Sequence, residues 1–391
     1  MPTSLLRARS GHEHSRVTFV ELFFDLVFVF AITQLSHALL GHLTASGLLQ
    51  TTLLFMAVWC VWIYTSWVTN WLDPERTPVR LMLFALMLAG LVLSTSIPKA
   101  FEGKGLAFAG AYAFMQVGRS LFMLWALKGN SPGNYRNFQR ITAWLALSAS
   151  FWIAGGLADS EWRLGLWLTA VAIEFVAPWI YFWTPGLGRS TTADWDVEGA
   201  HMAERCGLFI IIALGESILV TGAKFGSLPW TAATVAAFLV AFAGSVAMWW
   251  IYFNIGAERA SRHIAAAADP GRVARLAYTY LHMPLVAGII VAAVGDELVL
   301  AHPGGHTDAK TAAVLVGAPA LYLVGNLMFK RATASSPAFS HMVGLVLLVL
   351  LIPLSTMVQP LAFSAATMLV LVVVAAWETL SLRSGPKPAA V

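Results

Sequence analysis

The chain has 391 residues, of which 58% are hydrophobic and only 11% are charged. Soluble domains carry roughly 25% charged residues, so this composition excludes an ordinary soluble protein. Apolar runs long enough to cross a hydrocarbon core about 30 Å thick recur along the whole length, and they leave no room for a sizeable soluble domain. The formal net charge of +4 comes from Lys and Arg spread over the loops, which argues against nucleic acid as a partner.

Two further features of the composition bound the class of protein. Cys60 and Cys206 both fall inside apolar runs, so they indicate neither a disulfide framework nor a thiolate metal site. The first apolar run begins near Val17 and is too long for the apolar region of a signal peptide. We therefore expect this run to remain as the first helix of the protein.

Twelve membrane-spanning helices are predicted, because helices are the only open-ended structure whose backbone polar groups are satisfied in lipid. The first six helices are expected at residues 17–40, 47–70, 79–98, 105–127, 138–157 and 161–183. The second six are expected at residues 200–223, 228–255, 273–295, 310–330, 338–358 and 360–382.

The basic residues predict the orientation of these helices. With the N-terminus inside, 17 Lys and Arg residues lie in loops on the cytoplasmic side and five lie on the other side, while Arg119 and Arg205 lie within helices. Cytoplasmic loops carry the excess of Lys and Arg, so both termini are expected to face the cytoplasm of a multi-pass inner-membrane protein.

The two halves of the chain share an order of short motifs. ELFFDLVFVFAIT begins at Glu21 and ERCGLFIIIALGE at Glu204, WIY recurs at 62–64 and 250–252, and VG recurs at 117–118 and 324–325. Six helices per copy is an even number, so both copies would enter the membrane from the same side as parallel repeats. The predicted organisation is a first six-helix repeat at 1–183, a cytoplasmic linker at 184–199 and a second six-helix repeat at 200–391.

The seventh predicted helix carries four ionisable side chains. His201, Glu204, Arg205 and Glu216 fall within an arc of about 120° at about 100° per residue. A charge at mid-bilayer costs roughly 2.5 to 3.5 kcal/mol on insertion scales, so this face is expected to look into protein or a wet cavity. Gly215 beside Glu216 would permit the close approach of another helix or an ion.

Acids outnumber bases among the residues inside the predicted helices. The acids are Glu21, Asp25, Glu174, Glu204 and Glu216, and the bases are Arg119 and Arg205. A buried carboxylate without a partner takes up a proton, binds a cation or sits in water, because the bare charge is too costly. Glu21 alone is equally well read as an acid at a helix start, Arg119 as the partner of a carboxylate, and Asp296 and Glu297 as a solvated pair at the outer surface.

The blocks RVTFVELFFDLVFVFAITQLSH and HMAERCGLFIIIALGESI resemble the bacterial low temperature requirement A (LtrA) family over essentially the whole chain. The resemblance implies a polytopic inner-membrane protein required for growth in the cold, and it supplies no biochemical activity. FFDLVFVFAIT at residues 23–33 is also similar to the opening helix of lysosomal-type potassium channels, which are built from six-span units and lack a TVGYG filter.

Three functions remain open from the sequence. The first is a transporter or channel for a small cation, coupled to protons, with Asp25, Glu204, Glu216, Glu21 and Glu174 as ion or proton sites. Arg205, Arg119, His201, His37 and His282 would then support these acids. The second is a metal-dependent enzyme acting on a lipid, with a metal held by His201, Glu204, Glu174 and either His282 or His37.

The third function is a structural membrane protein whose buried charges only pair helices. We see no dinucleotide or phosphate-binding motif, so no soluble cofactor is expected. The lipid bilayer is the one partner that the sequence predicts outright. The transported species, the identity of any metal and the formation of a homo-oligomer are left open.

Overall fold

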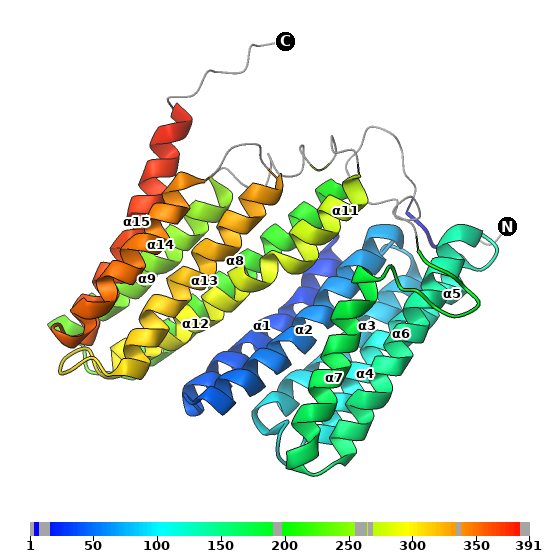
Figure 1. Ribbon diagram of the computed structural model, residues 1–391, viewed down its shortest axis with the longest axis horizontal. Helices are drawn as coiled ribbons and strands as arrows, with labels where there is room; N and C mark the ends of the chain where they lie inside the picture. Colours follow the sequence, from blue (N-terminus) through cyan, green and yellow to red (C-terminus); the bar gives the residue numbers. More distant parts are fainter. Residues whose placement is uncertain are drawn as a thin grey trace. The chain divides into compact units, whose positions relative to one another are not determined.

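A computed structural model of the chain describes residues 4–7, 16–190, 198–254, 264, 269–333 and 338–383. In that part of the chain the regular elements are all helical, which confirms the all-α prediction (Figure 1). The chain divides into two compact units. One contains residues 1–205 and 267–275, and the other contains residues 206–266 and 276–391.

The helices of the first unit follow the predicted spans closely. They are α1 (Phe19–Gly41), α2 (Ala45–Trp71), α3 (Thr77–Ser96) with a 3₁₀ turn η1 (Ile97–Lys99), α4 (Gly105–Ala113), a π-helical turn η2 (Phe114–Gly118), α5 (Arg119–Leu127), α6 (Pro132–Leu157) and α7 (Ser160–Trp179). The segment α4–η2–α5 is the single helix that the sequence predicts at 105–127, with a π turn in its middle.

Helices α8 and α11 lie, in sequence, at the boundaries between the two units. Helix α8 (Gly199–Gly226) begins in the first unit and continues in the second, because the division falls between Arg205 and Cys206. The short helix α11 (Pro270–Ala274) belongs to the first unit. The predicted linker carboxylates Asp194 and Asp196 lie outside the described residues.

The helices of the second unit also agree with the predicted spans. After α8 come α9 (Ala232–Phe253), the π-helical turn η4 (Arg275–Tyr280), α12 (His282–Ala301), α13 (Ala309–Thr333), α14 (Phe339–Leu351), the 3₁₀ turn η5 (Ile352–Thr356) and α15 (Pro360–Arg383). Two ends differ from the prediction: α12 continues six residues beyond the predicted 295, and α14 gives way after Leu351 to the 3₁₀ turn η5, seven residues before the predicted 358.

Among the described residues, nine helical segments are long and apolar enough to cross a membrane: α1, α2, α3 with η1, α8, α9, the segment containing α12, α13, α14 with η5, and α15. The other three predicted spans are helical as well, but they are more polar or interrupted by the π turn. All twelve predicted spans are thus helical in the described part of the chain, and nine of them qualify as membrane spans by length and composition. The crossing of the other three, and the arrangement as two parallel repeats, stay predictions.

Local sequence explains where several helices begin. Thr18 precedes α1 as the N-cap of a capping box with Glu21, and the Thr44 hydroxyl accepts a hydrogen bond from the Gly47 N–H at 3.1 Å before α2. Asp308 does the same for α13, since its carboxylate accepts from the Thr311 N–H at 2.9 Å. The N–H of Thr311 holds the pKa of the Asp308 carboxyl below its usual value.

Each unit packs its helices around its own centre. In the first unit α1 contacts α2 and α3, α3 contacts α4, α4 contacts α6, α6 contacts α7, and α7 contacts α2, so these helices close a ring. In the second unit α12 packs on α13, α13 on α14, α14 on α15, α15 on α9, and α9 on α12 (Figure 1). Both arrangements leave a shielded interior where polar side chains can be held.

The distribution of side chains is that of a protein in lipid. Large apolar residues such as Leu88, Leu219 and Leu350 are about two-thirds exposed, at 67%, 69% and 68%. Charged residues are buried instead, including Glu21, Asp25 and Arg205 at 0% exposure. Water would favour the opposite arrangement, so the outer faces of the helices suit a hydrocarbon surrounding.

Candidate functional site

The first unit holds a charged cluster formed by Arg7, Glu21, Asp25, His201 and Arg205, all of which are buried or nearly so. The predicted stripes of α1 and α8 meet here, because the first two turns of α8 belong to this unit. Two networks run side by side along α1, one centred on Glu21 and the other on Asp25. Asn70, Trp62 and Ser66 of α2 complete them.

Glu21 is fully satisfied by its neighbours. Its Oε2 accepts hydrogen bonds from the Thr18 N–H at 2.9 Å, the Thr18 hydroxyl at 3.0 Å and Arg7 Nη2 at 3.0 Å. Its Oε1 accepts from His201 Nε2 at 3.0 Å. Arg7 also donates through Nε to the carbonyl oxygens of Thr69 and Leu72, at the end of α2. The carboxylate therefore ties α1, α2 and α8 together.

Asn70 fixes the tautomer of His201. The Glu198 N–H donates to Asn70 Oδ1 at 3.1 Å, while Asn70 Nδ2 donates to the Glu198 carbonyl at 3.0 Å and lies 3.2 Å from His201 Nδ1. This backbone pairing sets the amide orientation, so the amide nitrogen faces the ring. His201 Nδ1 faces the amide as an acceptor, which assigns the proton to Nε2 and its donation to Glu21 Oε1. Arg7 Nη2, which is also a donor, lies 3.2 Å from the same Nε2 and makes no hydrogen bond to it in this tautomer. The imidazole is consequently neutral.

Asp25 forms a buried ion pair with Arg205. Its Oδ1 accepts from Arg205 Nη2 at 2.9 Å and from Trp62 Nε1 at 2.8 Å, and Arg205 Nη2 also donates to the Ser66 hydroxyl at 3.1 Å. The guanidinium lies over the Trp62 ring, 5.7 Å from its centroid. Asp25 Oδ2 and two nitrogens of Arg205 have no hydrogen-bond partner within the described residues. The pair is neutral overall but incompletely satisfied.

Glu174 lies in a second network of the first unit. It accepts from four donors: the Tyr112 hydroxyl at 2.5 Å, Gln116 Nε2 at 3.0 Å, the Ser148 hydroxyl at 2.6 Å and Trp152 Nε1 at 3.3 Å. Among the described residues these partners are all neutral. Four donors match the four acceptor positions of an ionised carboxylate, so the anion is stabilised without direct contact with a base.

Arg119 is not the direct partner of a carboxylate that the sequence suggests. In the described part of the chain it donates to the Val61 carbonyl at 3.2 Å, to the Thr65 hydroxyl at 2.9 Å and to Gln116 Oε1. Gln116 stands between the guanidinium and Glu174, because its amide oxygen takes the arginine and its amide nitrogen takes the acid. The Gln116 amide therefore separates the Arg119 guanidinium from the Glu174 carboxylate and hydrogen-bonds to both.

The remaining predicted residues have separate surroundings. Glu204 is exposed and accepts from the Val17 N–H at 3.1 Å, and His37 is exposed on α1. Glu216 is buried in α8 of the second unit at 2% exposure. His282 of the same unit accepts from the Tyr252 hydroxyl at 2.8 Å and donates Nδ1–H to the Ala277 carbonyl at 2.8 Å. These two contacts make it a hydrogen-bonded core histidine.

Sequence reasoning missed several members of these networks. Arg7 counts as a loop charge by position, and Asn70, Gln116 and Ser148 are uncharged residues inside apolar runs. In the second unit Lys330 and Glu378, far apart in the chain, form a buried ion pair at 2.5 Å that His341 joins at 3.3 Å. A search of the sequence for every polar side chain inside the predicted helices would have identified these residues except Arg7, which precedes the first helix.

The alternative of a metal centre requires acids and histidines to converge. Within the described ranges no group of three or more His, Cys, Asp or Glu side chains lies close enough to hold a metal ion. The ring nitrogens of His201 instead contact Asn70 and Glu21, and Glu174 is surrounded by hydroxyl, amide and indole groups.

The helices, their apolar exposed faces and the buried charges define an integral membrane protein. The chain belongs to the family described as bacterial low temperature requirement A protein (LtrA), whose model matches residues 16–376. It is 42% identical over 375 residues to an uncharacterized protein of Rhizobium meliloti (strain 1021), covering 96% of this chain and 92% of that protein. No solved structure matches the chain.

Proposed function

We propose that the protein transports a small cation across the bacterial inner membrane and couples this movement to protons, with Glu174 as a proton-accepting site. The observation that carries this proposal is the position of the Ser148 hydroxyl. It lies 2.6 Å from Glu174 Oε1 and 3.1 Å from the Ala170 carbonyl oxygen, so it has two acceptors within reach.

This choice of acceptors lets Glu174 change protonation state without leaving a buried group unpaired. When the carboxylate is ionised, Ser148 donates to it. When the carboxyl is protonated, Ser148 turns its hydrogen to Ala170 and accepts from the acid. Because an unpaired buried donor or acceptor costs about 1 to 3 kcal/mol, a site that satisfies both states can titrate at low cost.

The charged cluster of Arg7, Glu21, Asp25, His201 and Arg205 supports a different role. Each acid in it is already matched by a base, and the cluster joins α1, α2 and the start of α8. We assign these ion pairs the role of holding the helices together. The structural function considered from the sequence then applies to this cluster alone. Glu216 and Glu204 keep their proposed places as ion or proton sites.

The proposed membrane placement follows the basic residues. Seventeen Lys and Arg residues fall on the side of the N-terminus and five on the other, so both termini are assigned to the cytoplasm. Orientation is measured by labelling single cysteines placed in alternate loops, after Cys60 and Cys206 are replaced.

The test is proton movement by the purified protein in lipid vesicles that carry a pH-sensitive dye. Glu174→Gln keeps the shape of the side chain and removes its titration, so we expect flux driven by a cation gradient to fall to the level of empty vesicles. Glu161→Gln is the matched control, since Glu161 is an exposed acid in the first turn of the same helix. Wild-type flux in the folded Glu174→Gln variant would refute the proposal.

A further inference from the structure

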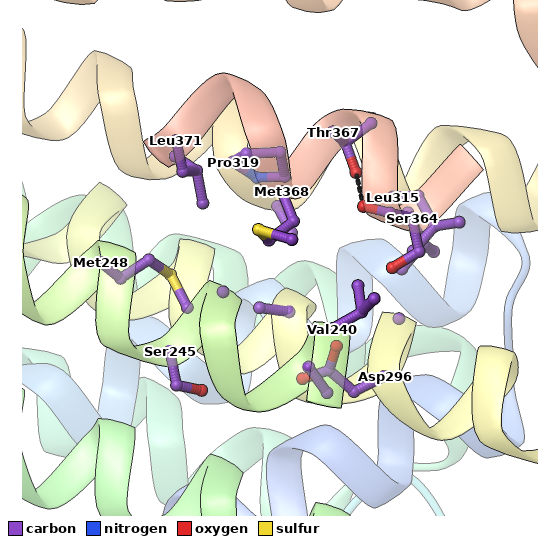
Figure 2. A pocket seen from close by; sticks show the side chains of 16 residues that line it. Val240, Ser245, Met248, Asp296, Leu315, Pro319, Ser364, Thr367, Met368 and Leu371 are labelled. Carbon is purple, nitrogen blue, oxygen red and sulfur yellow. Dashed lines mark hydrogen bonds between the residues drawn. The ribbon is translucent and has the colours of Figure 1, made fainter. Parts of the chain in front are cut away.

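The second unit contains a small cavity bounded by four helices. Its volume is about 50 Å³, and its lining comes from α9, α12, α13 and α15 (Figure 2). Pockets for organic ligands measure roughly 300 to 1,000 Å³, so this cavity is too small for one. It has room for a small ion together with water, since about 10 to 15 Å³ of such space is enough to hold one water.

Asp296 brings a carboxylate to this cavity. The sequence places it at the outer surface, but α12 continues to Ala301, so Asp296 lies five residues inside the helix, about 7.5 Å from its end. It is partly buried and has no hydrogen bond or ion pair in the described part of the chain. Its neighbour Glu297 is paired with Lys224 at 3.4 Å.

Neutral oxygen atoms surround the same space. Ser245 and Ser364 are 4% and 7% exposed, and neither hydroxyl has a hydrogen-bond partner among the residues that the structure describes. Figure 2 shows Ser364 and Asp296 directed into the cavity from α15 and α12. Thr367 donates to the Ser364 carbonyl at 3.0 Å, which leaves the lone pairs of its own oxygen available.

Pro319 removes one helical donor beside the cavity. Proline has no N–H, so the carbonyl four residues earlier, that of Leu315, lacks its helical donor. Leu315 lines the cavity next to Gly295, whose lack of a side chain leaves α12 and α13 close together. The Asp296 carboxylate and the hydroxyls of Ser245, Ser364 and Thr367 together offer hard oxygen atoms at this cavity.

We propose that this cavity binds a single sodium ion, with Asp296 as its one anionic ligand. Oxygen donors suit hard cations, and one negative charge balances a monovalent ion. A partly buried carboxylate without a partner is stabilised in its ionised form by such a charge. The inference rests on the proposed function for its physiological sense, because it names the cation that the transporter would carry.

The experiment measures equilibrium binding to the whole chain in detergent, using radioactive sodium with choline as the replacement salt. We expect saturable binding of one sodium per chain, at least a tenfold loss of affinity in Asp296→Asn, and unchanged affinity in the control Glu297→Gln. Gly244→Ala narrows the cavity without touching Asp296, since its Cβ would lie 3.8 Å from Met368 Cγ. It should weaken sodium binding and leave the thermal unfolding temperature unchanged.

Each other outcome overturns the inference. Absence of saturable sodium binding, equal affinity in Asp296→Asn, or competition by protons alone would remove the sodium site. Selective binding of silver, a probe for copper(I), would assign the cavity to the sulfur atoms of Met248 and Met368, which also line it. Binding is read without flux, so loss of flux in Glu174→Gln with intact sodium binding separates the failure of one proposal from the other.

Discussion

Replacing Arg205 by Met would leave the Asp25 carboxylate inside the first unit without a positive partner, with only the Trp62 indole N–H donating to it among the described residues. Both side chains are 0% exposed, and Arg205 Nη2 contacts Asp25 Oδ1 at 2.9 Å. Removing one member of a buried pair costs about 3 to 5 kcal/mol, because the other charge remains without compensation. At about 1.4 kcal/mol per tenfold, the ratio of folded to unfolded protein should fall by roughly two to nearly four orders of magnitude.

The double variant Asp25→Asn with Arg205→Met is the informative comparison. It removes both charges. Replacing a buried ion pair by uncharged residues often changes the free energy of unfolding little, so the loss of stability in the double variant should be clearly smaller than the sum of the two single losses. Unfolding by denaturant in lipid bicelles measures the four free energies of this cycle. Additive losses would show that the pair does not act as a unit and would refute the assignment of this cluster to holding helices.

Two further changes test packing and helix capping in the second unit. Gly288→Leu should destabilise the α12–α13 contact by about 1 to 3 kcal/mol, because even a Cβ would lie 2.8 Å from the Tyr322 nitrogen; the control Gly317→Leu, with nothing within 4 Å of its Cβ, should be near neutral in thermal unfolding. The pKa of Asp308 is lowered in the folded protein, so its contribution to stability is present above about pH 4 and is lost as the pH falls further. Asp308→Ala should therefore lose about 1 kcal/mol at pH 7 and progressively less as the pH falls below about 4, and a loss independent of pH would contradict the capping assignment.

The helices could be predicted from the sequence because apolar length and the helical requirement in lipid depend on local residues alone. The boundaries that differ have local causes that hydropathy does not report. The stretch 105–127 contains a π turn at Phe114–Gly118, and α12 carries Asp296 and Glu297 within its last turns instead of ending before them.

The site was predictable only in part. The face shared by His201 and Arg205 follows from helical periodicity, and so does the face of Glu21 and Asp25, but the pairing of these two faces depends on tertiary packing. Asn70 sets the proton of His201, and nothing in its sequence surroundings marks it. The count of acids and bases inside the predicted helices leaves out Arg7. Its position before the first helix gives no sign that its side chain turns inward to Glu21.

The π turn between α4 and α5 determines how Gln116 and Arg119 face their partners. A π turn accommodates one residue more than an α turn, so deleting a residue between Phe114 and Gly118 would restore an ordinary helix and rotate the segment before it by about 100° against the segment after it. Tyr112 and Arg119 could then no longer reach Glu174 and Thr65 at the same time. The extra residue in this turn thus holds Glu174 and Arg119 on opposite sides of the Gln116 amide.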